Sequence, residues 1–101
     1  MGRVIRATLL AIGLLVLAVP AQAACGDPPA PGVDWRRCDF SGRNLAGADL
    51  RQARLYDANL RDADLTGARI DQADLLGAQL GGARWIDGTT ICGEGSVSTC
   101  E

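Results

Sequence analysis

Few side chains in this sequence are suited to catalysis. The chain has no histidine and no lysine, and all ten of its basic residues are arginine. Histidine is the most common general base and the most common imidazole metal ligand, so its absence leaves Ser41, Ser96 and Ser98 without an evident activating group. Asp62 and Asp64 are close together, as paired acids would be, but the repeat described below places Asp62 at a solvated corner. We therefore expect a non-enzymatic protein.

Ligand sites are also poorly supported. Gly81 and Gly82 resemble a phosphate-binding loop, but no helix follows them, as that site requires. The four cysteines are scattered without a CxxC motif, which disfavours zinc. The net charge of −2 argues against a nucleic-acid binder. We expect no cofactor and no metal.

Residues 1–23 have the layout of a secretory signal peptide. Arg3 and Arg6 precede an uncharged apolar run over residues 9–19, and Pro20 is followed by the small-x-small cleavage site at residues 21–23. Eleven apolar residues are too few to span a bilayer as a helix. We expect cleavage after Ala23 and export to the periplasm or the medium. Two alternatives stay open, a retained membrane anchor and lipid attachment at Cys25, although Gln22 stands where lipidation signals usually have an aliphatic residue.

The remaining 78 residues would carry a net charge of −4 and few large aliphatic side chains, so the fold depends on their pattern. Eleven five-residue blocks cover residues 33–87 without a gap. The first position is alanine in eight blocks and the fifth is glycine in five. The third position is always large and apolar: Trp35, Phe40, Leu45, Leu50, Leu55, Leu60, Leu65, Ile70, Leu75, Leu80 and Trp85.

A period of five fits neither a helix, which would spread the leucines around its axis, nor a straight strand, which would alternate their faces. A chain that bends once per block returns each leucine to one interior, and glycine tolerates such bends. Opposite charges then indicate the length of one turn of the coil. All six charged pairs separated by twenty residues are opposite in sign, which predicts four sides of five residues: Asp34–Arg54, Arg37–Asp57, Asp49–Arg69, Arg51–Asp71, Arg54–Asp74 and Asp64–Arg84.

The blocks follow the pattern A-(D/N)-L-x-x, as in residues 48–50 and 58–60, and this pattern resembles the pentapeptide-repeat family. The resemblance implies an all-β fold, a right-handed quadrilateral β-helix (a solenoid) of about 2.75 coils over residues 33–87, with the first and third positions pointing inward. Val33, Cys38 and Arg43 depart from the small first-position residue. We expect Arg43 to reach water at an open first coil.

The ends of such a coil need covers, because exposed edges invite aggregation. We interpret Trp35, Phe40 and Trp85 as structural end plugs. The proline-rich residues 24–32 are expected to form an irregular N-terminal cap, since proline cannot enter an inner strand. Residues 88–101 are expected to form a C-terminal disulfide loop.

The cysteines allow three pairings, and export would favour disulfides. The coils place the two ends more than about 10 Å apart, whereas bridged Cα atoms lie within about 7 Å. This predicts disulfides that join Cys25 to Cys38 and Cys92 to Cys100, leaving the fold with disulfide-tied ends.

The function expected from these features is a protein-interaction or structural module of the cell envelope, with an unknown partner and oligomeric state. Arg36, Tyr56 and Leu76 occupy equivalent fourth positions in successive coils and form a possible contact patch. The alternative is a DNA mimic that regulates a type II topoisomerase, as some members of the family do. Export and the net charge of only −1 over residues 33–87 disfavour it, since a mimic needs a sustained negative potential.

Overall fold

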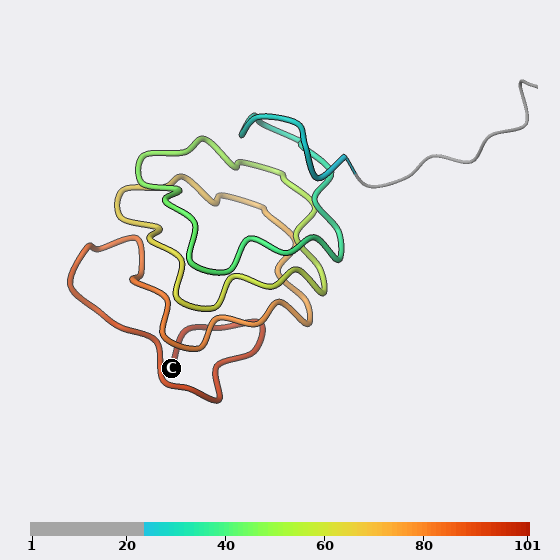
Figure 1. Cartoon of the computed structure of the whole chain (residues 1–101). Coiled ribbons are helices and arrows are strands. Elements are labelled where there is room, and N and C mark those ends of the chain that lie inside the picture. The colour runs from blue at the N-terminus through green and yellow to red at the C-terminus, as the bar shows by residue number, and fades with distance from the viewer. Residues whose placement is uncertain (1–23) are drawn as a thin grey trace, which may run out of the picture.

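The computed structural model describes residues 24–101 as a stack of coils that share one axis (Figure 1). The expected export signal, residues 1–23, lies outside the described residues. Successive coils are joined by parallel β-bridges between residues that are twenty apart, which is the spacing that the opposite charges predict. The bridged pairs are Asp34 with Arg54, Asp39 with Asn59, Asn44 with Asp64, Asp49 with Arg69, Arg54 with Asp74, Asn59 with Gln79 and Asp64 with Arg84.

Backbone hydrogen bonds between coils repeat in each block. The third-position N–H donates to a carbonyl of the next coil, as Leu50 does to Arg69 (2.8 Å) and Leu55 to Asp74 (2.8 Å). The corners interrupt this pairing every five residues, so residues 24–101 contain isolated bridges but neither an α-helix nor a continuous strand. Accordingly, no helix in this part of the chain has the length and hydrophobicity needed to cross a bilayer.

The corners lie at the fifth position, as the glycines predict. Every fifth-position residue from Arg37 to Gly82 has a positive φ, between 58° and 74°. Half of these residues are not glycine and adopt a backbone conformation that L-residues usually avoid: Arg37, Gln52, Asp57, Asp62 and Gln72.

Where the second position is Asp or Asn, its side chain stabilises the corner that follows. Oδ1 of Asp39 accepts a hydrogen bond from the backbone N–H of Ser41 (3.0 Å), and Asn44 does the same for Ala46 (3.0 Å). This contact closes a local turn before the corner and explains the preference for Asp or Asn at this position. The sequence interpretation assigned the second-position acids to charge pairs between coils and did not anticipate the turns.

The first and third positions point into the coil. Leu50, Leu55 and Leu60 are buried on successive sides of the same interior, and Ala58 and Ala63 are buried beside them. Both alanines have almost no exposed surface, so a larger side chain there would have to displace its neighbours. The two inward positions per block give a continuous apolar core despite the low content of large aliphatic residues.

The N-terminal segment covers part of the first coil. Cys25 is bonded to Cys38, and the indole Nε1 of Trp35 donates to the carbonyl of Asp27 (3.2 Å). Trp35 and Phe40 are buried, with ring centroids 4.1 Å apart. The N-terminal cover is thus held to the first coil by one disulfide and by hydrogen bonds, among them the bond from the buried Trp35.

Arg43 lies exposed at this end, with its guanidinium 5.3 Å from the centroid of the Phe40 ring. Arg43 does not occupy the interior, which accounts for an arginine at a first position. The charge stays hydrated while its stem covers an aromatic ring.

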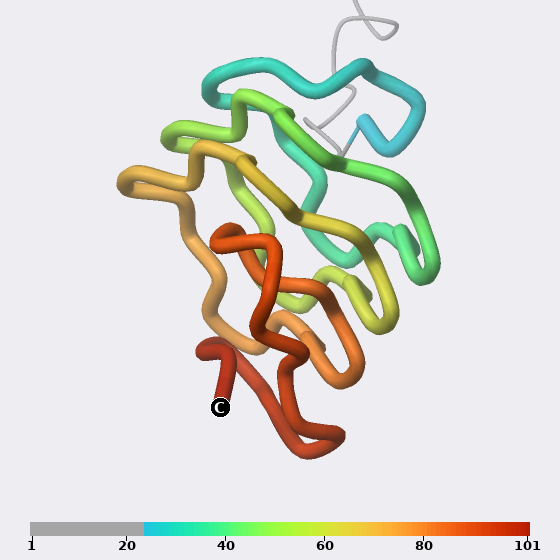
Figure 2. The backbone as a smooth tube through the Cα atoms, turned by 90° about the vertical axis from the view of Figure 1, so that its left-hand side faces the viewer, coloured from blue at the N-terminus to red at the C-terminus, as the bar shows by residue number. Residues whose placement is uncertain are grey.

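The C-terminal segment folds back beneath one half of the last coil, as Figures 1 and 2 show. Ile91 pairs antiparallel with Arg84, and Val97 pairs antiparallel with Gln79. Cys92 is bonded to Cys100, the second disulfide that the sequence predicts. The antiparallel pairing itself was not predicted, since these residues have no repeat that would reveal it.

Gly81 is placed where this C-terminal segment comes closest to the coil. A Cβ atom there would lie 2.6 Å from the carbonyl oxygen of Glu94, a backbone contact that cannot rotate away. We expect Gly81→Ala to destabilise the protein by about 1–3 kcal/mol in urea unfolding. Gly95→Ala, in the same segment but with open space around its Cβ, is the matched control and should stay within about 0.5 kcal/mol of the wild type. Equal stability of the two variants would contradict the close contact.

Candidate contact surface

One side of the coil carries the predicted patch. Asp34, Arg54 and Asp74 are bridged in a column, so the fourth-position residues Arg36, Tyr56 and Leu76 follow one another along the same side. Leu76 is 72% exposed, the largest value among the exposed large hydrophobic residues of the described part of the chain. Arg36 and Tyr56 are partly buried. The side therefore passes from a charged group through an aromatic ring to an aliphatic side chain.

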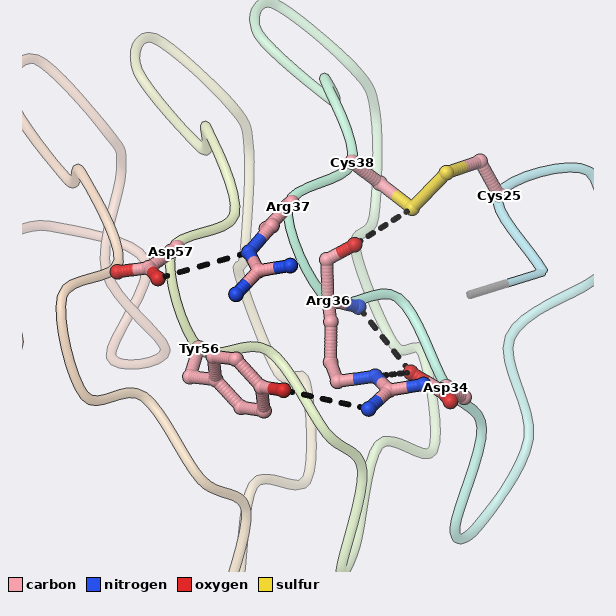
Figure 3. A network of polar contacts seen from close by, with 7 residues as sticks. All are labelled: Cys25, Asp34, Arg36, Arg37, Cys38, Tyr56 and Asp57. Carbon is pink, nitrogen blue, oxygen red and sulfur yellow. Dashed lines mark hydrogen bonds and ion pairs between the residues drawn. A yellow bond between two sulfur atoms is a disulfide. The ribbon is translucent and has the colours of Figure 1, made fainter. Parts of the chain in front are cut away.

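The upper part of this surface is a network of polar contacts (Figure 3). Nη1 of Arg36 donates to the hydroxyl oxygen of Tyr56 (3.2 Å), and Nε of Arg36 donates to Oδ1 of Asp34 (2.8 Å). The Arg36 guanidinium carbon lies 5.8 Å from the centroid of the Tyr56 ring. These contacts hold the tyrosine side chain, which remains partly exposed.

A second arginine lies beside the same ring. The guanidinium carbon of Arg37 is 5.9 Å from the Tyr56 centroid, and its Nε is 4.0 Å from Oδ2 of Asp57. The period of five predicts the alignment of Arg36, Tyr56 and Leu76, but it does not place Asp34 or Arg37 in the patch. The sequence does contain a signal for Asp34, because this residue precedes Arg36 by two positions and lies in the same corner turn.

The charges of this network are stable at neutral pH. Two hydrogen bonds raise the pKa of Arg36 above its usual value, and the bond to Tyr56 contributes more than the bond to Asp34. Partial burial is the largest single influence on Asp34 and raises its pKa, but the hydrogen bonds and charge of Arg36 together outweigh it, so the pKa of Asp34 lies below its usual value. Both groups remain ionised, and the surface supplies paired charges and an aromatic ring rather than a group that exchanges protons.

The remaining charged pairs behave differently from the sequence interpretation. Of the six pairs separated by twenty residues, only Arg37 with Asp57 lies within ion-pair distance among residues 24–101. Two other ion pairs join residues of one corner, Arg36 with Asp34 and Arg51 with Asp49 (2.7 Å). The short aspartate side chain reaches its own turn more easily than the next coil, so the pairs one coil apart act at longer range.

The other residues selected from the sequence lie outside this surface. Asp62 is exposed at a corner, and the side chain of Asp64 accepts hydrogen bonds from the backbone and hydroxyl of Thr66 rather than forming an ion pair with Arg84. Trp85 lies partly buried in the last block. Within residues 24–101, no group of three or more His, Cys, Asp or Glu side chains is placed to hold a metal ion.

Comparison with known protein families gives one match. The family model described as "Pentapeptide repeats" matches in eight copies over residues 36–72 and 57–84. No curated protein and no solved structure is significantly similar to the chain. The matched residues include most of those that bridge from coil to coil in the structure. The chain belongs to the pentapeptide-repeat family.

Proposed function

We propose that this protein is an exported, non-enzymatic interaction or structural module of the cell envelope. In this proposal its repeats form a right-handed quadrilateral β-helix of about two and three-quarter coils, and the side that carries Arg36, Tyr56 and Leu76 contacts a protein partner. Membership of the pentapeptide-repeat family supports a repeat scaffold, since such stacked coils offer rigid, persistent faces.

The fixed position of Tyr56 beside the exposed Leu76 carries the proposal. Arg36 and Arg37, both on the preceding coil, contact the tyrosine ring, so its ordering costs little when a partner binds. Tyrosine and arginine are enriched at the centres of protein interfaces, where an apolar body with a polar tip is useful. Leu76 adds an apolar surface of its own at the next coil. Such a combination suits a protein partner better than a small molecule.

The proposed location rests on the disulfides and on the N-terminal sequence. Two disulfides tie the ends of the described part of the chain, and disulfides are typical of oxidising compartments. Residues 1–23 have the composition of an export signal. Expression of the full chain with an epitope tag, followed by cell fractionation, tests export directly, and a reduced protein retained in the cytoplasm would contradict it.

The contact surface is tested by capture from a periplasmic extract. The tagged wild-type protein is compared with Tyr56→Ala/Leu76→Ser, and we expect a partner captured by the wild type to be lost from this variant. Ser41→Ala/Ala46→Ser is the matched control, because it changes two exposed fourth-position residues on other sides. Capture of no partner, or of the same partners by all three proteins, would overturn the surface assignment.

A further inference from the structure

The lower edge of the last coil has unpaired backbone groups. In every complete coil the N–H groups of the third and fifth positions and the carbonyl of the first position bond to the next coil. At residues 68–76 this next coil is missing. The amides of Ile70, Gln72 and Leu75 and the carbonyls of Ala68 and Ala73 have no hydrogen-bond partner among residues 24–101.

Two hydrogen bonds within the chain bound this open edge, one at each end. On one side the amide of Gly67 donates to the carbonyl of Ile86 (2.8 Å). On the other side the amide of Gly77 donates to the Ser98 hydroxyl oxygen (2.8 Å). The edge between them is as long as two blocks. An extended segment of about eight residues would fill it.

The covered half of the same coil shows how such a segment binds. Leu80 donates to the carbonyl of Ser96 (3.0 Å), and Gly82 donates to the carbonyl of Cys92 (2.8 Å). The C-terminal residues thus supply in the same chain what the open half lacks. A backbone strand laid along a free edge is a common mode of peptide recognition.

The interior is also less protected at the open edge. Ile70, Ala73 and Leu75 are only partly buried, whereas Leu50 and Leu55, the third-position residues one coil above, are buried completely. A segment with apolar residues over Ile70 and Leu75 would complete the core. The interior therefore sets a second requirement for the ligand, two apolar side chains that are five residues apart.

Charge sets the third requirement. The coil above the open edge places Asp49 over Arg69, Arg51 over Asp71 and Arg54 over Asp74. All six charged pairs at this spacing are opposite in sign. A ligand that follows the same rule carries an acid at the position of Arg69 and bases at the positions of Asp71 and Asp74.

We propose that the open edge over residues 68–76 binds an extended segment of a partner protein with the pattern small–acidic–apolar–basic–x–small–basic–apolar. This inference rests on the proposed function as an interaction module and names the chemistry of one partner. The segment extends the coil by two sides. Its backbone pairs with the five free groups, and its charges match Arg69, Asp71 and Asp74.

The sequence of residues 48–55, ADLRQARL, has this pattern and supplies the probe. An acetylated, fluorescent peptide of this sequence is titrated with the disulfide-intact protein, and binding is followed by fluorescence anisotropy. Methyl groups on the peptide nitrogens of the acidic residue and of the second arginine block the bonds to the carbonyls of Ala68 and Ala73. We expect binding to weaken about tenfold or more. Methyl groups on the two leucine nitrogens, which face away from the edge, are the matched control and should change affinity little.

The charge rule is tested by reciprocal exchange. The Arg69→Glu variant should bind the unmodified probe about tenfold more weakly. A probe with arginine in place of its acidic residue should bind this variant with the original affinity. Arg84→Glu, a second-position arginine on the covered half, should leave the affinity unchanged. Tyr56→Ala is the control that distinguishes this edge from the contact surface. It should reduce the capture of partners and leave the affinity for the probe unchanged.

Two results would overturn the proposal. One is that the wild-type protein binds both methylated probes equally well, or binds the charge-exchanged probe as tightly as the unmodified probe. The other is a dimer in sedimentation that Arg69→Glu converts to a monomer, because a second copy would then occupy the edge. If the protein captures no partner from the periplasmic extract but still binds the probe, the contact-surface proposal is overturned. The assignment of the open edge is then retained.

Discussion

Replacing Leu60 with alanine is expected to lower the free energy of unfolding by about 2–5 kcal/mol. Leu60 has no exposed surface and lies between coils both above and below. The backbone around it cannot collapse into the cavity, since each side is held by hydrogen bonds to both neighbouring coils. Urea unfolding followed by tryptophan fluorescence measures the loss. Because the whole domain is small, we expect the variant to be largely unfolded at 37 °C.

Leu76→Ala is the control for this prediction. It makes the same chemical change within the same repeat, but at an outward position that is already 72% exposed. Its effect should stay within about 0.5 kcal/mol. Similar losses for Leu60→Ala and Leu76→Ala would contradict the assignment of the third position to the interior.

Removal of the Cys25–Cys38 disulfide is expected to cost about 2–4 kcal/mol. The double variant Cys25→Ala/Cys38→Ala keeps a small apolar side chain at the first position of its block, where eight other blocks have alanine. The loss therefore measures the cross-link rather than packing. The same change should free the N-terminal cover from Trp35, whose indole bonds to Asp27. In a Trp85→Phe background, the emission of Trp35 should shift to longer wavelength before global unfolding.

The second disulfide provides the comparison. Cys92→Ala/Cys100→Ala opens a loop with a sequence separation of 8 instead of 13 and should cost less, because a shorter loop restricts the unfolded chain less. It should leave the emission of Trp35 unchanged. Unchanged Trp35 emission in the Cys25→Ala/Cys38→Ala variant would mean that the cover stays in place without its covalent bond.

The repeated part of the fold was predictable because each feature recurs. A single leucine says little, but eleven apolar residues at intervals of five require a chain that bends once per block. The spacing of opposite charges, such as Asp49 and Arg69, predicted the twenty-residue turn that the bridges have. Both disulfide pairs followed from the distance between the two ends, which the repeat determines.

Features that occur once were harder to predict. The antiparallel pairing of the C-terminal segment with the coil, through Ile91 and Val97, depends on the backbone of the coil and has no pattern in the C-terminal sequence. The candidate surface was found only in part. The alignment of Arg36, Tyr56 and Leu76 follows from the period, but the bond from Arg36 to Asp34 depends on a local turn. Side chains that can reach both their own corner and the next coil cannot be assigned by spacing alone.

The twenty-residue register also relates the two ends of the molecule. The N-terminal cover lies over one part of the first coil, and the C-terminal segment lies under one half of the last. Inserting one block of five residues would keep the first and third positions inward, yet it would turn one end by a quarter of a revolution relative to the other. Four blocks would restore the angle and lengthen the stack by about 4.8 Å. The number of blocks therefore sets the direction in which the two ends face, and a lineage could change that direction without redesigning the core.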